Sequence, residues 1–174
     1  MYKLKKNLIL TGMMGVGKST VGKILSKELG MAFGDVDKII EKKLSLSISE
    51  IFEVRGESFF RQIEEVESLK LIKKKNIIIA LGGGAFINKK IRKHIKKFST
   101  SIWLDLNSEN IYQRVKKSKR RPLLSNIENK KDIETIYVER RKIYSKADYK
   151  INCDGKKKGE VVKKIKEIYE NKKN

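Results

Sequence analysis

Residues 7–20 read NLILTGMMGVGKST, and this stretch decides the fold. Residues 7–11, with the aliphatic centre Leu8-Ile9-Leu10, predict a short buried strand. It leads into Gly12-Met13-Met14-Gly15-Val16-Gly17-Lys18-Ser19, which matches the pattern G-x-x-x-x-G-K-[ST] in full. The apolar spacing from Val21 to Leu29 then predicts a helix over residues 18–30. A strand, a glycine-rich turn and a helix are the context in which this pattern binds phosphate.

The chemistry of the pattern follows from its residue types. Glycines let the backbone turn tightly, so that successive N–H groups point at phosphate oxygens, and the helix N-terminus adds its positive dipole end. Lys18 supplies a mobile charge for the β and γ phosphates, and the Ser19 hydroxyl is a ligand for Mg²⁺. The sequence therefore predicts binding of ATP or GTP and leaves the acceptor open. We assign the nucleotide contacts to Gly15, Val16, Gly17, Lys18, Ser19 and Thr20.

Aliphatic runs and helical patterns alternate along the rest of the chain. We expect further strands at residues 31–34, 76–81, 101–106 and 149–153. The expected helices are residues 35–71, 89–98, 108–116, 130–146 and 159–171, the first of them broken near residues 44–49 and at Gly56. Such alternation implies a parallel sheet covered by helices on both faces, so the fold class is α/β.

Composition limits the broad class. The 174 residues fit one domain, 1–174, and no apolar run is long enough for a membrane span, so we expect a cytoplasmic protein with no membrane partner. The formal charge of +21 alone would suggest nucleic acid. The lysines are spread along the whole chain, however, and no nucleic-acid-binding motif is visible. We expect solvated basic faces, no nucleic-acid partner, and a structural role for the single cysteine, Cys153, near a strand end.

Two acids end the second expected strand. Asp35 and Asp37 should lie beside the phosphate loop, because ligands of open α/β sheets bind at the carboxyl ends of the strands. One carboxylate could support the metal while the other accepts a hydroxyl proton. The alternative is an ordinary acidic cap of the next helix.

An arginine follows in Gly56-Glu57-Ser58-Phe59-Phe60-Arg61-Gln62-Ile63-Glu64. Glu64 lies three residues after Arg61, where it can orient the guanidinium toward a carboxylate ligand. A surface ion pair is the alternative.

Gly82, Gly83 and Gly84 follow the strand at residues 76–81. Three glycines at a strand end allow a ligand to approach the backbone closely. Many enzymes with a phosphate loop carry an aspartate at the end of such a strand, and this chain has none there. Asp105 imitates that aspartate after a later strand, and we set it aside because we expect it later in the sheet.

In combination these features resemble the shikimate kinase family. The phosphate loop, Phe33-Gly34-Asp35-Val36-Asp37, G-E-x-x-F-R-x-x-E, the glycine triplet, Arg121-Pro122-Leu123-Leu124 and Arg140-x-x-x-Tyr144 occur in the order and spacing typical of that family. The resemblance covers residues 7–152. It implies a three-layer fold with five parallel strands in the order 2-3-1-4-5, as in nucleoside monophosphate kinases, and a monomer. It also implies transfer of the ATP γ-phosphate to the 3-hydroxyl of shikimate, a step toward chorismate and the aromatic amino acids.

The resemblance gives each acceptor-side residue a role. Asp37 would hold the 3-hydroxyl as base or orienting group. Arg61 and Arg140 would bind the shikimate carboxylate from two sides. The pocket would be lined by the backbone of Gly82, Gly83 and Gly84, with Phe52 and Phe60 near the ring. Residues 33–61 would form this substrate-binding part.

On the nucleotide side, the resemblance implies that Asp35 reaches Mg²⁺. Lys18 and Arg121 would neutralise the transferring phosphoryl group, and Arg114 would pack on the adenine. The basic segment at residues 115–127 would act as a lid over ATP.

Three rival functions stay open. Arg61 and Arg140 favour an anionic acceptor, but gluconate is also a carboxylate. Another kinase with a phosphate loop, such as a gluconate kinase or a nucleotide kinase, is therefore the nearest alternative. The glycine triplet and G-E-x-x-F-R favour shikimate. A nucleic-acid-binding NTPase rests on charge alone. A non-catalytic regulator with this fold would not need every catalytic position filled, as it is here.

Overall fold

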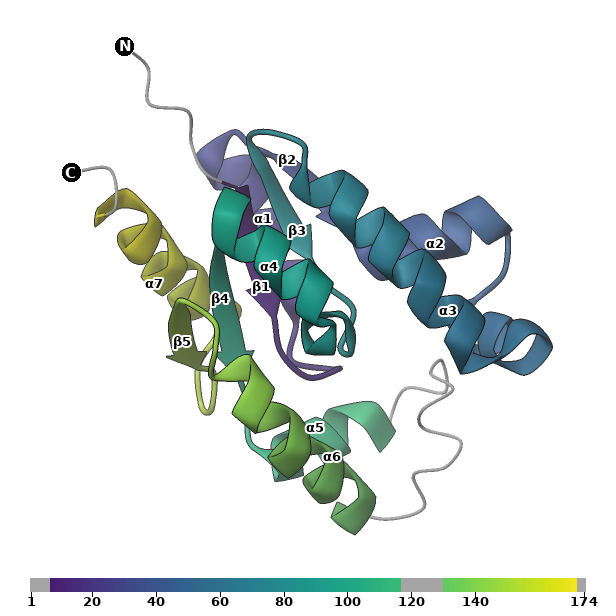
Figure 1. The fold of residues 1–174 in the computed structure, drawn as a ribbon. Coiled ribbons are helices and arrows are strands. Elements are labelled where there is room, and N and C mark those ends of the chain that lie inside the picture. Colours follow the sequence, from purple (N-terminus) through teal and green to yellow (C-terminus); the bar gives the residue numbers. More distant parts are fainter. Residues whose placement is uncertain (1–6, 117–129, 172–174) are drawn as a thin grey trace.

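The computed structural model describes residues 7–116 and 130–171. In that part of the chain, five parallel strands form one sheet in the order β2-β3-β1-β4-β5 (Figure 1). This confirms the α/β class and the strand order implied by the family resemblance. The strands are β1 (Asn7–Thr11), β2 (Ala32–Asp35), β3 (Ile77–Ala80), β4 (Ser99–Asp105) and β5 (Tyr149–Asn152).

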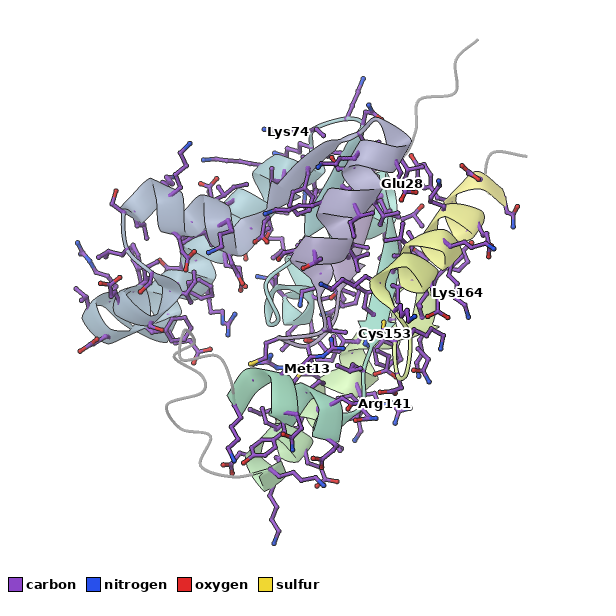
Figure 2. All side chains as sticks on the ribbon, turned by 180° about the vertical axis from the view of Figure 1, so that it is seen from behind. Met13, Glu28, Lys74, Arg141, Cys153 and Lys164 are labelled. Carbon is purple, nitrogen blue, oxygen red and sulfur yellow. The ribbon has the colours of Figure 1, made fainter. Side chains whose placement is uncertain are left out.

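Helices cover both faces of the sheet. The views from the front and from behind show α3 and α4 on one face and α1 and α7 on the other (Figures 1 and 2). On the first face, Lys90 of α4 and the cap residue Asn88 both bind Glu65 of α3 at 2.7 Å. The helices are α1 (Lys18–Leu29), α2 (Val36–Leu44), α3 (Ile48–Ile72), the short 3₁₀ helix η1 (Ala85–Ile87), α4 (Lys89–Phe98), α5 (Ser108–Lys116), α6 (Lys130–Tyr144) and α7 (Lys158–Asn171).

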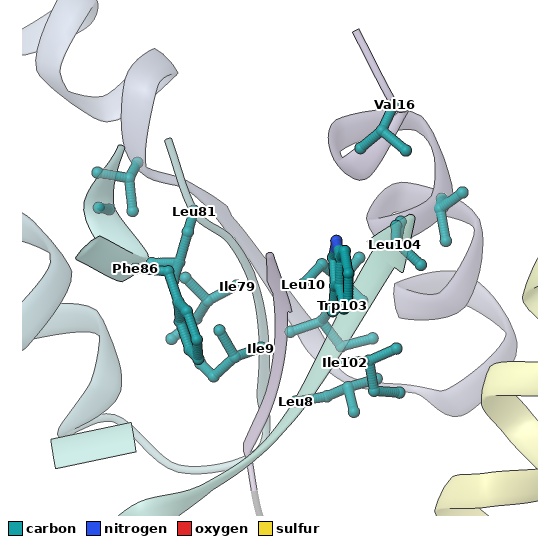
Figure 3. Close-up of a cluster of buried hydrophobic side chains, with 14 of the residues drawn as sticks. Leu8, Ile9, Leu10, Val16, Ile79, Leu81, Phe86, Ile102, Trp103 and Leu104 are labelled. Atoms are coloured by element: carbon teal, nitrogen blue, oxygen red, sulfur yellow. The ribbon is translucent and has the colours of Figure 1, made fainter. Parts of the chain in front are cut away.

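The centre of the core is β1, which pairs with β3 on one side and β4 on the other. Leu8, Ile9 and Leu10 are all 0% exposed. Because side chains alternate along a strand, Ile9 points to the face that carries Phe86, while Leu8 and Leu10 point to the opposite face (Figure 3). Apolar contact on both faces explains why this strand reads as an unbroken aliphatic run.

The two expected breaks in the long helical stretch are confirmed. Ser45 takes a left-handed conformation after α2, and Ser47 and Glu50 form a reciprocal capping box that starts α3. Gly56 has φ 79° and ψ 168°, which no helix allows, so α3 bends there. The bend separates the segment that carries Phe52 from the segment that carries Arg61.

Some boundaries differ from the prediction. The fourth strand begins at Ser99 rather than residue 101, because Ser99 and Thr100 are buried and pair with the first residues of β1. The 3₁₀ turn η1 directly after the glycine triplet was not predicted.

Cys153 is buried just after β5, as expected, and burial raises the pKa of its thiol to about 11, which keeps it protonated. The basic side chains are dispersed: Figure 2 shows Lys74 before β3 and Lys164 on α7, far apart on the molecule. Among the described residues, the structure contains no helix with the length and apolarity needed to span a membrane.

Candidate active site

The carboxyl ends of β1, β2 and β3 bring together segments that are distant in sequence. Asp35 at the end of β2 is in register with Ala80 at the end of β3, and the Leu81 amide donates to the Leu10 carbonyl at 3.1 Å. The phosphate loop, the acidic pair and the glycine triplet therefore meet at one edge of the sheet. The sequence analysis expected Asp35 and Asp37 at this edge of the sheet.

The phosphate loop depends on its glycines. Gly12 has φ +135°, and a Cβ atom there would lie 2.4 Å from the Leu104 carbonyl oxygen, so no larger residue fits. Gly15 and Gly17 also have positive φ values. Lys18 is buried, and its Nζ donates to the carbonyls of Gly12 and Met13 at 2.7 and 2.8 Å. Its charge is therefore held inside the loop.

Asp35 has two partners, one of which confirms that it caps the next helix. Its Oδ1 caps α2 by accepting from the Lys38 amide at 3.2 Å, and its Oδ2 accepts from Ser19 Oγ at 2.5 Å. The Ser19 hydroxyl and the Asp35 carboxylate are hard oxygen ligands of the kind that Mg²⁺ prefers. Among the described residues, no group of three or more His, Cys, Asp or Glu side chains could hold a metal.

The glycine triplet lies where charged side chains converge. A Cβ on Gly82 would lie 2.4 Å from Glu64 Oε1 and 2.6 Å from Asp37 Oδ1. A Cβ on Gly84 would lie 2.4 Å from Arg61 Nη1, and one on Gly83 would lie 3.5 Å from Arg140 Nη1. Two carboxylates and two guanidinium groups thus surround the triplet, which we call the glycine loop (Gly82–Gly84).

Arg61 is held more firmly than a surface ion pair would require. Its Nη1 donates to Glu64 Oε2 at 2.8 Å, and its Nε and Nη2 both donate to Glu57 Oε1, at 3.1 and 2.9 Å. The guanidinium also lies over the Phe60 ring, 5.2 Å from its centroid. The Phe60 ring is 4.8 Å from that of Phe52, so the two aromatics form one wall beside the arginine.

Glu64 is an unusually buried acid, only 2% exposed. Burial raises the pKa of its carboxyl, and the nearby Asp37 adds to this effect, while Arg61 and Arg140 oppose it. Its Oε1 has no hydrogen-bond partner and faces the same point as Asp37 Oδ1. The two acids therefore act on each other as like charges.

Arg140 approaches the glycine loop from α6. Its Nη1 donates to the Gly83 carbonyl at 3.2 Å, and Tyr144, one helical turn later, donates its hydroxyl to the same oxygen. Arg61 on α3 and Arg140 on α6 therefore reach the loop from different helices.

Of the remaining candidates, Arg114 donates to the Gly15 carbonyl at 3.2 Å, so it lies beside the phosphate loop. Val16 is buried, and Ser19 and Thr20 are exposed in the first turn of α1. Arg121 and most of the predicted lid, residues 117–127, lie outside the described residues.

Sequence reasoning missed two contacts. Glu57 was not assigned to Arg61, and Tyr144 had no role, although each lies four residues from its arginine, a spacing that brings side chains together on a helix. Asp105 ends β4, which comes after β3 and β1 in the strand order, as expected. Its carboxylate is bound by the Tyr137 hydroxyl at 2.9 Å and by Lys150 Nζ at 2.8 Å.

The raised pKa of Glu64 predicts a pH effect on stability. The folded protein favours the neutral form of Glu64 more than water does. The contribution of Glu64 to stability is therefore fully present below its unfolded pKa, near the reference value of 4.5, and is lost as pH rises through the folded pKa. We compare the free energy of unfolding of the native protein with that of Glu64→Gln. The advantage of the native protein should fall as pH rises above 4.5, by about 1.4 kcal/mol for each pKa unit between the folded and unfolded states. Urea denaturation between pH 4 and 8 measures this. A difference that grows with pH would refute the assignment.

Crowding at Gly82 predicts a second effect. In Gly82→Ala the new methyl group must displace Glu64 or Asp37, so we expect kcat/KM for shikimate, the acceptor implied by the resemblance, to fall about 100-fold. Binding of ATP should change little. Gly159→Ala on α7 is the matched control, because a Cβ there meets nothing within 4 Å. Equal activity of the two variants would contradict the predicted crowding.

Comparison with known proteins agrees with this geometry. A family model described as shikimate kinase matches residues 14–170. A shikimate kinase of Thermodesulfovibrio yellowstonii is 43% identical over 167 residues, which are 95% of this chain and 95% of that protein.

Solved structures of shikimate kinases resemble this chain more closely than a solved gluconokinase does. The structure of shikimate kinase from Acinetobacter baumannii in complex with shikimate matches with a TM-score of 0.92 and 34% identity, over 97% of this chain and 94% of that one. A gluconokinase from Sinorhizobium meliloti matches with a TM-score of 0.59 at 12% identity, over 97% of this chain and 95% of that one. This second likeness extends to the fold alone. On its sequence, its strand order and these matches, the chain belongs to the shikimate kinase family.

Proposed function

We propose that this chain uses ATP to phosphorylate the 3-hydroxyl of shikimate, giving shikimate 3-phosphate. The observation that carries the proposal is the glycine loop with Arg61 on one side, Arg140 on the other and Asp37 at its start, all at the edge that holds the phosphate loop. Two guanidinium groups suit a carboxylate, and one carboxylate suits a hydroxyl.

The acceptor would be held at both ends. Its carboxylate would bind Arg61 and Arg140, whose orientations are set by Glu64 and by the Gly83 carbonyl. The backbone of the glycine loop would lie against the ring, near Phe52 and Phe60. Asp37 would then receive the 3-hydroxyl and accept or orient its proton. This fixed placement supplies much of the catalysis, since phosphoryl transfer depends mainly on positioning and charge neutralisation.

The phosphate groups of ATP would lie in the loop between β1 and α1. Lys18 would turn its ammonium from the Gly12 and Met13 carbonyls toward the β and γ phosphates. Ser19 and Asp35 would hold Mg²⁺, which when bound neutralises phosphate charge. Arg114 would lie beside the adenine, and its contact with Gly15 supports that placement.

Several finer points remain proposals. We propose a single kinase domain, with residues 33–61 as its acceptor-binding part, residues 115–127 as a lid and Arg121 as a contact to the transferring phosphoryl group. The basic composition of the segment supports the lid, because it would neutralise ATP and exclude water on closure. We also propose a monomer without a nucleic-acid partner, and a cytoplasmic location because ATP is the co-substrate.

The acceptor is tested directly by comparing turnover. A coupled assay of ADP release with Mg-ATP should show phosphorylation of shikimate. The kcat/KM for gluconate or nucleoside monophosphates should be at least about 100-fold lower, because an acceptor of another shape would not place its hydroxyl on Asp37 in line for transfer. Preferred turnover of gluconate or a nucleoside monophosphate would overturn the acceptor and leave nucleotide binding untouched.

The role of Asp37 is tested by Asp37→Asn. If Asp37 accepts the proton, kcat should fall by about 10²- to 10⁴-fold while KM for shikimate changes only a few-fold, because the amide can still hold the hydroxyl. Glu170→Gln, an exposed acid on α7, is the matched control and should behave as the native enzyme. A kcat within threefold of the native value would show that Asp37 is no base.

A further inference from the structure

Tyr144 belongs to one of the family motifs, and the chemistry above gives it no role. It ends α6 and is 0% exposed. Its hydroxyl donates to the Gly83 carbonyl and lies 3.9 Å from the Met13 sulfur of the phosphate loop. A single hydroxyl thus contacts both the acceptor side and the nucleotide side of the site.

The ring of Tyr144 is fixed by its neighbours. Its centroid is 6.0 Å from that of Trp103 on β4 and 6.4 Å from that of Phe86 on η1. Burial raises the pKa of the phenol to about 12, so the hydroxyl keeps its proton at any physiological pH. It is therefore a permanent donor at a fixed place.

The Gly83 carbonyl has two lone pairs and two donors, Tyr144 and Arg140. The two donors lie one helical turn apart on α6 and interact with each other. Tyr144 donates to one lone pair of the carbonyl, so Arg140 donates only one N–H group to it. The other N–H groups of the guanidinium can then bind a ligand. The peptides around Gly83 are trans, so a fixed carbonyl also fixes the direction of the following N–H, that of Gly84.

We propose that Tyr144 is a positioning residue for the acceptor: its hydroxyl holds the Gly83 carbonyl and thereby sets the glycine loop and leaves the Arg140 guanidinium available to the shikimate carboxylate. The inference rests on the proposed function. The carbonyls of Gly82 and Gly84 accept from the backbone amides of Ala85 and Ile87, at 3.2 and 2.9 Å. The half-buried Gly83 carbonyl depends on side chains instead, and without the hydroxyl Arg140 would be its one donor among the described residues.

Tyr144→Phe tests this, because it removes one oxygen and keeps the ring in its place. We expect KM for shikimate to rise about tenfold, the equivalent of one hydrogen bond, while kcat and KM for ATP change less than about twofold. Unchanged KM for shikimate, or an equal rise in both KM values, would overturn the proposal. Absence of shikimate turnover in the native enzyme is a different result and would refute the proposed function itself.

Tyr137→Phe is the matched control. Tyr137 lies on the same helix and donates its hydroxyl to Asp105 at 2.9 Å, away from the glycine loop. Its variant should lose comparable stability, measured by urea denaturation, and keep the native KM for shikimate. If Tyr137→Phe raised that KM as much as Tyr144→Phe does, the effect would be general loosening of α6 and the proposal would fail.

A second measurement needs no variant, in case Tyr144→Phe does not fold. In native protein labelled with ¹³Cζ-tyrosine, the Tyr144 resonance, which reports the hydrogen bond of the hydroxyl, should shift when shikimate is added and move less with ATP alone. A Tyr144 resonance that shikimate leaves unchanged would overturn the inference.

Discussion

The close approach of charged side chains to the glycine loop is the constraint on which the site depends. At Gly82 and Gly84 a single added carbon would lie 2.4 Å from a carboxylate or guanidinium atom. That absence of side chains lets Asp37 from α2, Arg61 and Glu64 from α3, and Arg140 from α6 reach one place. Three helices that the sheet positions separately are thus joined at the end of β3.

The charges at this place balance, and the balance explains their burial. Glu64 is almost fully buried because Arg61 neutralises it, and Arg61 is in turn shared between Glu64 and Glu57. A buried ion pair contributes little net stability after desolvation, so we interpret its value here as orientation. A guanidinium that is already held loses less freedom when it binds a carboxylate ligand.

The sheet edge also links the two halves of the reaction. β1 leads into the phosphate loop, and its neighbour β3 leads into the glycine loop, so the donor and acceptor sites are adjacent by topology. Met13 lies in the first loop and within contact of Tyr144, which holds the second. The relative position of the two substrates is therefore set by packed and buried groups.

Much of this could be predicted from sequence because the signals were local. The phosphate loop and the breaks near residues 44–49 and at Gly56 each depend on residues that are close together in the sequence. The order of the strands is not a local property and came from the family resemblance. The 3₁₀ turn η1 and the early start of β4 were not predicted. Polar Ser99 and Thr100 belong to the strand because they pair with Asn7 and Leu8 of β1, a segment far away in the sequence.

At the site, too, the sequence predicted where Asp35, Asp37 and Tyr144 lie along the chain and not which groups they contact. Spacing could place Asp35 and Asp37 at the sheet edge, but only the structure shows that Asp35 both caps α2 and contacts Ser19. The direction of Tyr144 depends on how α6 packs against the glycine loop, which no pattern within the helix specifies. Residues that act through a backbone carbonyl of another segment are for this reason the hardest to find from sequence.

A crystal structure of the protein with shikimate and Mg-ADP tests the central claim most directly. The account predicts the shikimate carboxylate within hydrogen-bonding distance of both Arg61 and Arg140, the ring against the glycine loop, and the 3-hydroxyl on Asp37. A carboxylate bound elsewhere, with Arg61 and Arg140 still paired only to protein groups, would contradict it.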